Sequence, residues 1–232
     1  MDRYRLLEKE LRDYNYTTAT RNENGYHIAE NYGTPYPMLN TFYELGEGKY
    51  PENNEGFFLP PDQDEYVNYM FERCQRYAEG EHEDRFTDRY RDGWVQRFRR
   101  SWASFVRDVH FSFLCSSKNA FDKQRYTIHE DKNRKADLIG VKNDTSYRVS
   151  LFIDSKKGRE NLNRKIDRGT EGEITRDLIV PLRPNGAKYI VKTQEDKLWL
   201  YSNSHIDAIK QLIRKTKNSI LLEDGKTEVE LL

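Results

Sequence analysis

Two acidic residues and one lysine lie close together in the middle of the chain, at strand-like segments. Asp137 lies in the apolar run 135–141, whereas Asp154 ends the next apolar run and Lys156 follows two residues later. If the two runs pair as a hairpin, Asp137 can lie beside Asp154. Alternation along a strand would turn Asp154 and Lys156 to the same face. The spacing therefore predicts one site with two carboxylates and one ammonium group.

This set of groups suits the hydrolysis of phosphodiesters. Mg²⁺ prefers oxygen ligands, keeps several waters and binds through one or two carboxylates plus substrate phosphate. The ion polarises a phosphoryl oxygen and lowers the pKa of an attacking water. Lys156 would hold that water and offset charge in the transition state. The structural alternative is that Asp137 and Asp154 lie at strand ends and pair with Lys156, Lys157 or a nearby arginine.

The context of Asp154-Ser155-Lys156 distinguishes it from other copies of the same short pattern. An acid two residues before a lysine also occurs at Glu47, Glu130, Glu195 and Asp224. None of these copies both ends an apolar strand and follows an earlier acid in a neighbouring apolar strand. A carboxylate within the apolar run around Asp137 is costly to bury unless it is paired or bound to a metal.

The surrounding elements can be predicted from hydrophobic periodicity. One apolar stripe predicts a long helix over 87–116, with spacings of three and four residues from Trp94 to Phe113. Strands are predicted at 125–129, 135–141, 146–153, 177–182, 187–193 and 197–202, with helices at 159–168 and 205–217. A hairpin is predicted around Asp224-Gly225. This order predicts a mixed α/β or α+β domain.

The part of the chain before this domain is different in character. Helices are predicted at 2–14 and from Asp62 or Asp64 to about Glu79. The segment 15–61 is rich in Asn, Gly, Pro and Tyr, which argues against regular helix and favours short strands or an ordered cover.

At these residues the sequence resembles the PD-(D/E)xK nuclease superfamily, whose fold is restriction-endonuclease-like. The resemblance covers residues 93–168, about a third of the chain, in the order helix, strand, Asp137, Asp154-Ser155-Lys156, helix. It implies that Asp137 and Asp154 are metal ligands, that Lys156 is the catalytic lysine and that the Ser155 carbonyl is a further ligand. The family's proline before the first acid is replaced by Ala136. The implied core is a central mixed sheet flanked by helices, with an acidic, aromatic-rich N-terminal extension.

The family also places an acid on the helix, and Asp108 is the candidate. It lies beside the apolar stripe on a polar line with Ser101, Ser104 and Ser112. Asp108 is therefore a candidate extra metal ligand, and the alternative is a surface pair with Arg100 or Arg107. Glu130 is an alternative candidate for this additional acid.

Basic residues frame the predicted site. Those expected to contact phosphates are Lys157, Arg159, Arg164, Lys165, Arg97 and Arg100. Interleaved arginines and aromatics at the start of the long helix suit nucleic-acid backbones and stacking. A solvated face paired with neighbouring aspartates explains the same pattern equally well.

Charge divides the chain in two, although its total net charge is zero. Residues 1–84 carry a net charge of −10 and residues 85–232 a net charge of +10. We therefore expect an acidic N-terminal region at 1–84 and a nuclease-like catalytic domain at 85–232. A basic domain attracts polyanions such as nucleic acid. The acidic region would bind a protein partner, provide selectivity or cover the basic surface.

Other classes of protein find little support. No apolar run approaches the length of a membrane span, no signal-peptide core follows Met1, and two cysteines make no disulfide framework, so a cytoplasmic protein is expected. Aromatic residues make up 13%, which argues against wholesale disorder. The histidines and cysteines lack zinc spacing, and phosphate-loop and nucleophile-elbow motifs are absent.

The sequence thus predicts a Mg²⁺-dependent endodeoxyribonuclease acting on duplex DNA, in restriction, defence or DNA processing, with Mn²⁺ able to substitute. Many enzymes of this fold act as dimers, so a homodimer is also considered. One alternative is a non-enzymatic interaction or inhibitor protein on a nuclease-like scaffold, whose acidic half mimics DNA. Another is a nuclease that acts on RNA.

Overall fold

The computed structural model describes residues 3–20, 23–31, 35–49, 59–78, 87–126, 136–167, 176–218 and 226–228. The chain divides into two compact units. Unit 1 comprises Met1–Tyr4, Arg107–Tyr189 and Trp199–Leu232, and unit 2 comprises Arg5–Val106 and Ile190–Leu198. The division falls within a long helix and not at residues 84–85, where the net charge changes sign. Backbone packing and charge therefore divide this chain at different places.

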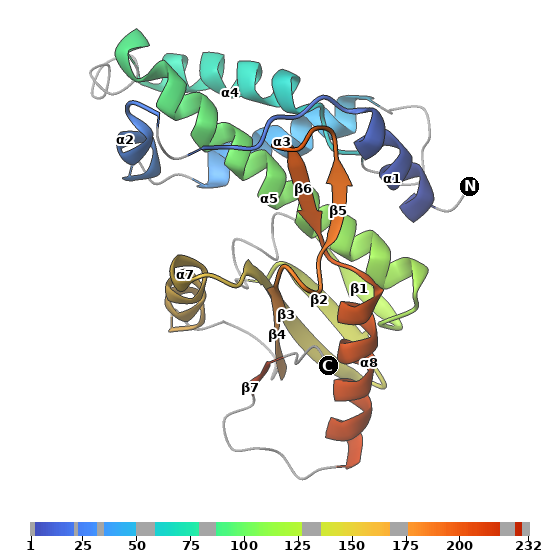
Figure 1. Ribbon diagram of the computed structural model, residues 1–232. Coiled ribbons are helices and arrows are strands. Elements are labelled where there is room, and N and C mark those ends of the chain that lie inside the picture. Colours follow the sequence, from blue (N-terminus) through green and yellow to red (C-terminus); the bar gives the residue numbers. More distant parts are fainter. Residues whose placement is uncertain are drawn as a thin grey trace. The chain divides into compact units, whose positions relative to one another are not determined.

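The elements of the described residues follow in chain order (Figure 1). The helices are α1 (Arg3–Asp13), α2 (Tyr26–Asn31), α3 (Pro35–Lys49), α4 (Gln63–Ala78), a 3₁₀ turn (Asp88–Tyr90), α5 (Arg91–Ser117), α7 (Lys156–Asp167) and α8 (Asn203–Asn218). The strands are β1 (Lys123–Arg125), β2 (Leu138–Lys142), β3 (Thr145–Ile153), β4 (Arg176–Leu182), β5 (Lys188–Val191), β6 (Lys197–Leu200) and β7 (Lys226–Glu228). The protein is thus a mixed α/β protein, as the sequence predicts.

Unit 1 is built on a mixed sheet with the strand order β1-β2-β3-β4-β7. Strands β1, β2 and β3 pair antiparallel, whereas β4 pairs parallel to β3 and β7 parallel to β4. Helix α7 lies in the connection between the two central parallel strands. The strand β7 pairs with β4, and residues 219–225, where a hairpin turn is predicted, lie outside the described residues. Residues 127–135 also lie outside the described residues, and they include most of the predicted strand 125–129.

One face of the sheet packs against α5 and α8. Its alternating side chains share a core with the end of α5 and with one face of α8, and the buried members include Val149, Val180, Phe111, Ile206 and Ile209. In Figure 1, α7 lies on the other side of β3 and β4 from α8. The strands therefore bury side chains on both faces, as the central strands of such layered folds do.

The second face of the sheet buries an ion pair. Arg148 on β3 and Asp177 on β4 are register partners, and their side chains are 8% and 13% exposed. The guanidinium Nε and Nη2 each donate to one carboxylate oxygen at 2.6 Å. The two charges face each other in this bidentate geometry, which makes the burial of both tolerable, while the Arg148 Nη1 is buried without a hydrogen-bond partner among the residues that the structure describes.

His205 near the start of α8 is buried and uncharged at neutral pH. Its Nδ1 accepts a hydrogen bond from the Ser202 backbone N–H at 3.1 Å, and its ring stands edge-on to Tyr201. Burial lowers the pKa of His205 to about 4, from an ordinary value of 6.5. Below pH 6.5 the unfolded chain therefore takes up a proton at this position that the folded chain does not.

This difference predicts that the folded state loses stability as the pH falls from 6.5 towards 4. The loss from His205 between pH 7 and pH 5 should be about 2 kcal/mol in the free energy of unfolding. The measurement is urea denaturation at both pH values, with His205→Asn as the comparison because it retains an acceptor without titrating. An equal loss in both proteins would contradict the prediction.

Unit 2 contains most of the predicted N-terminal helices and two that the sequence did not predict. Helices α1 and α4 confirm the predictions, whereas α2 and α3 show that the expectation of no regular helix in 15–61 is wrong. Pro35 opens α3, in the first turn where a missing N–H is tolerated. Met38 and Phe42 then bury one face of α3. Burial of that face outweighs the weak helix propensity of Gly, Asn and Tyr.

Candidate active site

The predicted hairpin of β2 and β3 is present and brings Asp137 to one edge of the sheet. Asn143 and Asp144 turn the chain with positive φ values of 50° and 59°, as a tight two-residue hairpin requires. Asp137 directly precedes β2, and its Oδ2 accepts a hydrogen bond from the Leu151 N–H of β3 at 2.6 Å. The carboxylate thereby continues the ladder of hydrogen bonds beyond the start of β2.

The register of this hairpin determines which residue lies opposite Asp137. Leu138 pairs with Val149, so Ser150 lies across from Asp137 and Asp154 follows four residues later. At about 3.3 Å per residue this separation is about 13 Å along the strand direction. The two carboxylates thus lie at the same edge of the sheet without being register partners, so the prediction that Asp137 lies beside Asp154 is wrong.

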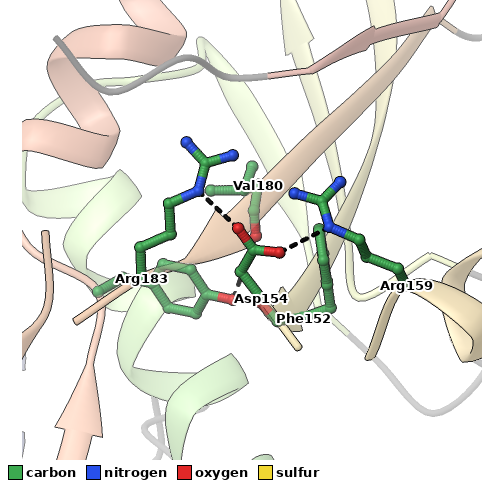
Figure 2. Close-up of polar contacts among 6 residues, drawn as sticks. Phe152, Asp154, Arg159, Val180 and Arg183 are labelled. Atoms are coloured by element: carbon green, nitrogen blue, oxygen red, sulfur yellow. Dashed lines mark hydrogen bonds and ion pairs between the residues drawn. The ribbon is translucent and has the colours of Figure 1, made fainter. Parts of the chain in front are cut away.

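Asp154 lies where the parallel strands β3 and β4 end, and two arginines hold its carboxylate. Oδ1 accepts from Arg159 Nε at 2.7 Å and Oδ2 accepts from Arg183 Nε at 2.6 Å. Figure 2 shows the carboxylate between the two guanidinium groups. Ile153 pairs with Leu182 in the parallel register, so the residues that follow them, Asp154 and Arg183, are neighbours. The hydrogen bond from Arg183, and then that from Arg159, lower the pKa of Asp154 against the opposing effect of burial.

Lys156 belongs to helix α7 and not to strand β3. Ser155 caps this helix, because its Oγ accepts the Gly158 N–H at 3.1 Å and its carbonyl accepts the Arg159 N–H at 2.9 Å. A Cβ atom on residue 158 would lie 2.1 Å from the Ile153 carbonyl oxygen, so only glycine allows so abrupt a turn from strand to helix. The predicted alternation of Asp154 and Lys156 on one strand face is therefore wrong. Lys156 is exposed in the first turn of α7.

A buried tyrosine, Tyr201, lies at this edge of the sheet. The Tyr201 hydroxyl lies within hydrogen-bond distance of the Val180 and Phe152 carbonyl oxygens, at 3.3 and 3.5 Å. Burial raises the pKa of Tyr201 well above its ordinary value, and the negative charges of Asp108 and Asp137 raise it further. The Phe152 carbonyl that lies near this hydroxyl is two residues before Asp154.

The predicted phosphate-binding residues are distributed over both units. Arg97 and Arg100 lie in unit 2, where they donate to the Ser101 and Tyr26 hydroxyl groups at 3.0 and 2.7 Å. Both hydrogen bonds lie within unit 2, and the predicted phosphate contacts of these two arginines stay a prediction. Lys157 and Arg159 lie on α7 at the edge occupied by Asp154. The side chains of Arg164 and Lys165 lie outside the described residues, as does Glu130.

Two residues of this site were not predicted from the sequence. Arg183 follows the strand 177–182, and Tyr201 is the penultimate residue of the strand-like run 197–202. The available signal was that parallel strands end at the same edge of a sheet, but the sequence does not specify that β3 and β4 are parallel neighbours.

The carboxylate oxygens of Asp137 and Asp154 are of the type that binds a hard cation, but in this structure they accept hydrogen bonds from other groups of the protein. Among the described residues, no three histidine, cysteine, aspartate or glutamate side chains are grouped so that they could hold a metal ion. Both Asp154 oxygens accept from arginines, and Asp137 Oδ2 accepts from a backbone N–H. Carboxylate and carbonyl oxygens are the ligands that Mg²⁺ prefers. A cation at Asp154 would therefore compete with the charges of Arg159 and Arg183 for the same carboxylate.

The chain matches no protein-family model and has no significant match among curated proteins or solved structures. In the part of the chain that the structure describes, none of the helices is long and apolar enough to cross a membrane.

Proposed function

We propose that this chain is a metal-dependent nuclease that hydrolyses phosphodiester bonds in DNA, on a restriction-endonuclease-like core formed by unit 1. The observation that carries the proposal is the β2–β3 hairpin that runs directly into α7. It has Asp137 beside one strand end, Asp154 after the other and Lys156 in the first helical turn. The mixed sheet, with α7 after the hairpin and α5 packed on the core, supports it.

In the proposed mechanism, the chain's own residues bind and orient the substrate. Asp137, Asp154, the Ser155 carbonyl and Asp108 are the proposed cation ligands. Because Asp137 and Asp154 are about 13 Å apart along the strand direction, their carboxylates would share one ion only after the segment that carries Asp154 moves towards Asp137. Bound Mg²⁺, or Mn²⁺ in its place, supplies Lewis-acid activation of the phosphoryl group. Lys156 holds the attacking water and offsets the negative charge that develops on phosphorus oxygens. Lys157 and Arg159 contact backbone phosphates on either side of the reacting bond.

A second candidate is a non-enzymatic phosphate-binding module. The observation that favours it is the pairing of both Asp154 oxygens with arginines, because the carboxylate then orders guanidinium groups and binds no cation. DNA or RNA would bind at the same edge of the sheet without being cleaved.

The experiment that tests the proposal is a cleavage assay with the whole chain. Supercoiled, duplex, branched and single-stranded DNA and RNA are each incubated with Mg²⁺, Mn²⁺ or EDTA. The expected result is cleavage of DNA that requires the cation. Cleavage of RNA alone would reassign the substrate, and the absence of cleavage on every substrate by folded protein would favour the binding module.

A further inference from the structure

We propose that Tyr189 is a stacking platform for an unpaired nucleobase, beside the edge of the sheet that carries Asp154. The proposed nuclease would then take a DNA strand that is single-stranded or locally unpaired next to the reacting bond. The inference deepens the proposed function, on which it rests for the choice of DNA as ligand. It assigns a binding role to β5, an element that lies well outside the short motif around Asp154.

The large hydrophobic side chains that unit 1 exposes lie near one edge of its sheet. In the described part of this unit they are Ile153 and Tyr189, which are 40% and 37% exposed. Ile153 is the register partner of Leu182, and the residues that follow these two are Asp154 and Arg183. Hydrophobic side chains exposed singly are common, whereas exposed ones that are grouped and bordered by polar side chains favour a binding surface.

A hydrogen bond holds Tyr189 next to the turn that begins at Arg183. The Tyr189 hydroxyl donates to the Pro184 carbonyl oxygen at 3.0 Å, and Pro184 directly follows Arg183. Standard backbone dimensions then place this hydroxyl within about 10 Å of the Arg183 Cα atom. The turn is closed by the Gly186 N–H, which donates to the Arg183 carbonyl at 3.1 Å, and anchored by Ser202 Oγ, which donates to the Gly186 carbonyl at 2.7 Å. The tyrosine ring and the arginine are thus held close together by one anchored turn.

The ring of Tyr189 is preorganised for stacking. It packs against Trp199 of β6 with 5.4 Å between the ring centroids and an interplanar angle of 70°, which is an edge-to-face arrangement. Because this packing and the hydrogen bond of the hydroxyl both hold the ring, little side-chain entropy is lost when a ligand binds. A base that stacks on an aromatic side chain strengthens binding about tenfold, and every base has a face that can stack.

Charge at the same edge favours a nucleotide over an apolar peptide as the ligand. Lys156 and Lys157 begin α7, and Arg159 and Arg183 donate to Asp154 (Figure 2). Cationic side chains raise the local concentration of a polyanion. An unpaired nucleotide combines a flat aromatic base with a negatively charged phosphate, whereas the bases of a duplex are stacked on one another and present only their edges. These observations therefore favour a strand with an unpaired base over a continuous duplex.

The test is the affinity of the whole chain for a short fluorescent oligodeoxythymidine, measured by anisotropy in EDTA so that no cation-dependent cleavage occurs. Tyr189→Ala should weaken binding about tenfold, whereas Tyr189→Phe, which retains the ring, should bind within about threefold of the wild type. Tyr69→Ala is the matched control, because Tyr69 on α4 of unit 2 has the same exposed fraction, 37%. It should change the affinity little.

Two further ligands separate stacking on the base from contact with the backbone. The wild type should bind an abasic strand of the same length about tenfold more weakly than oligodeoxythymidine, and Tyr189→Ala should bind the two strands with similar affinity. A fully paired duplex should bind to Tyr189→Ala and to the wild type equally. The proposal is overturned if Tyr189→Ala binds oligodeoxythymidine as Tyr69→Ala does, if the wild type does not distinguish the abasic strand, or if Tyr189→Ala binds the duplex as poorly as the single strand.

Tryptophan fluorescence locates the bound base. Trp94 and Trp102 are fully buried, whereas Trp199 is partly exposed beside Tyr189. Oligodeoxythymidine at saturation should therefore quench the emission of the wild type and of Tyr69→Ala, and should quench that of Tyr189→Ala much less. Equal quenching in all three proteins would contradict the placement of the base on Tyr189.

Failure of this proposal and failure of the nuclease proposal are distinguishable. Base-dependent binding that requires Tyr189, without any cleavage, would retain the platform and remove the enzyme. Cation-dependent cleavage with unchanged affinity in Tyr189→Ala would retain the enzyme and remove the platform.

Discussion

Asp154→Asn is expected to abolish cation-dependent DNA cleavage, with kcat/KM reduced at least about 1,000-fold, which corresponds to about 4 kcal/mol of transition-state stabilisation. The substitution removes the charge that binds the proposed cation while preserving the shape of the side chain. An amide also leaves Arg159 and Arg183 without their anionic partner. The measurement is the initial rate of cleavage of the best substrate at saturating Mg²⁺.

Two controls separate this loss of rate from a loss of structure. The unfolding midpoint of Asp154→Asn should remain near that of the wild type, because its arginine partners are solvent-exposed and such pairs contribute little. Arg214→Gln, which removes an exposed arginine from α8, should cleave at the wild-type rate. Cation-dependent cleavage by Asp154→Asn at even a tenth of the wild-type rate would exclude Asp154 as an essential cation ligand.

Asp177→Ala is expected to lower the free energy of unfolding by about 3–5 kcal/mol. Arg148 is buried beside Asp177 between two central strands, and removal of the carboxylate leaves a guanidinium charge there without its counter-ion. Desolvation of an unpaired charge is costly, so the loss should exceed that of an exposed pair such as Lys142 with Asp122. Urea denaturation followed by tryptophan fluorescence and by circular dichroism measures the change.

The matched variant replaces both partners. Arg148→Met combined with Asp177→Leu removes both charges and retains apolar volume, so it should recover most of the lost stability. A double variant as unstable as Asp177→Ala would show that the cost arises from packing and not from the unpaired charge.

Local pattern was sufficient to predict most of the secondary structure. The apolar stripe predicts α5, and alternation with turn residues predicts β2, β3 and β4 to within a few residues. Helix α3 was missed because tertiary burial of Met38 and Phe42 stabilises a segment whose residues favour turns. Propensity is a property of the local chain, whereas this burial depends on partners distant in the sequence.

The candidate site was only partly predictable for a related reason. Asp137 and Asp154 could be selected because they interrupt apolar runs, but their register depends on where the hairpin turn falls. The start of α7 at Lys156 depends on the Ser155 cap and on the close approach of Gly158 to the Ile153 carbonyl. In the sequence alone, these residues resemble a continuation of the preceding strand. Arg183 joins the site only through the parallel pairing of β3 with β4, which no short pattern specifies.

The chain has two cysteines, and each compact unit contains one of them. Cys115 lies buried in unit 1, and Cys74 lies half-buried in unit 2. Burial raises the pKa of Cys115 well above its ordinary value and that of Cys74 to about 12, so both are protonated thiols at neutral pH. Only the thiolate reacts readily with alkylating reagents. Burial and the raised pKa therefore slow the alkylation of both cysteines in the native protein, and local opening of either unit should raise the alkylation rate of its own cysteine.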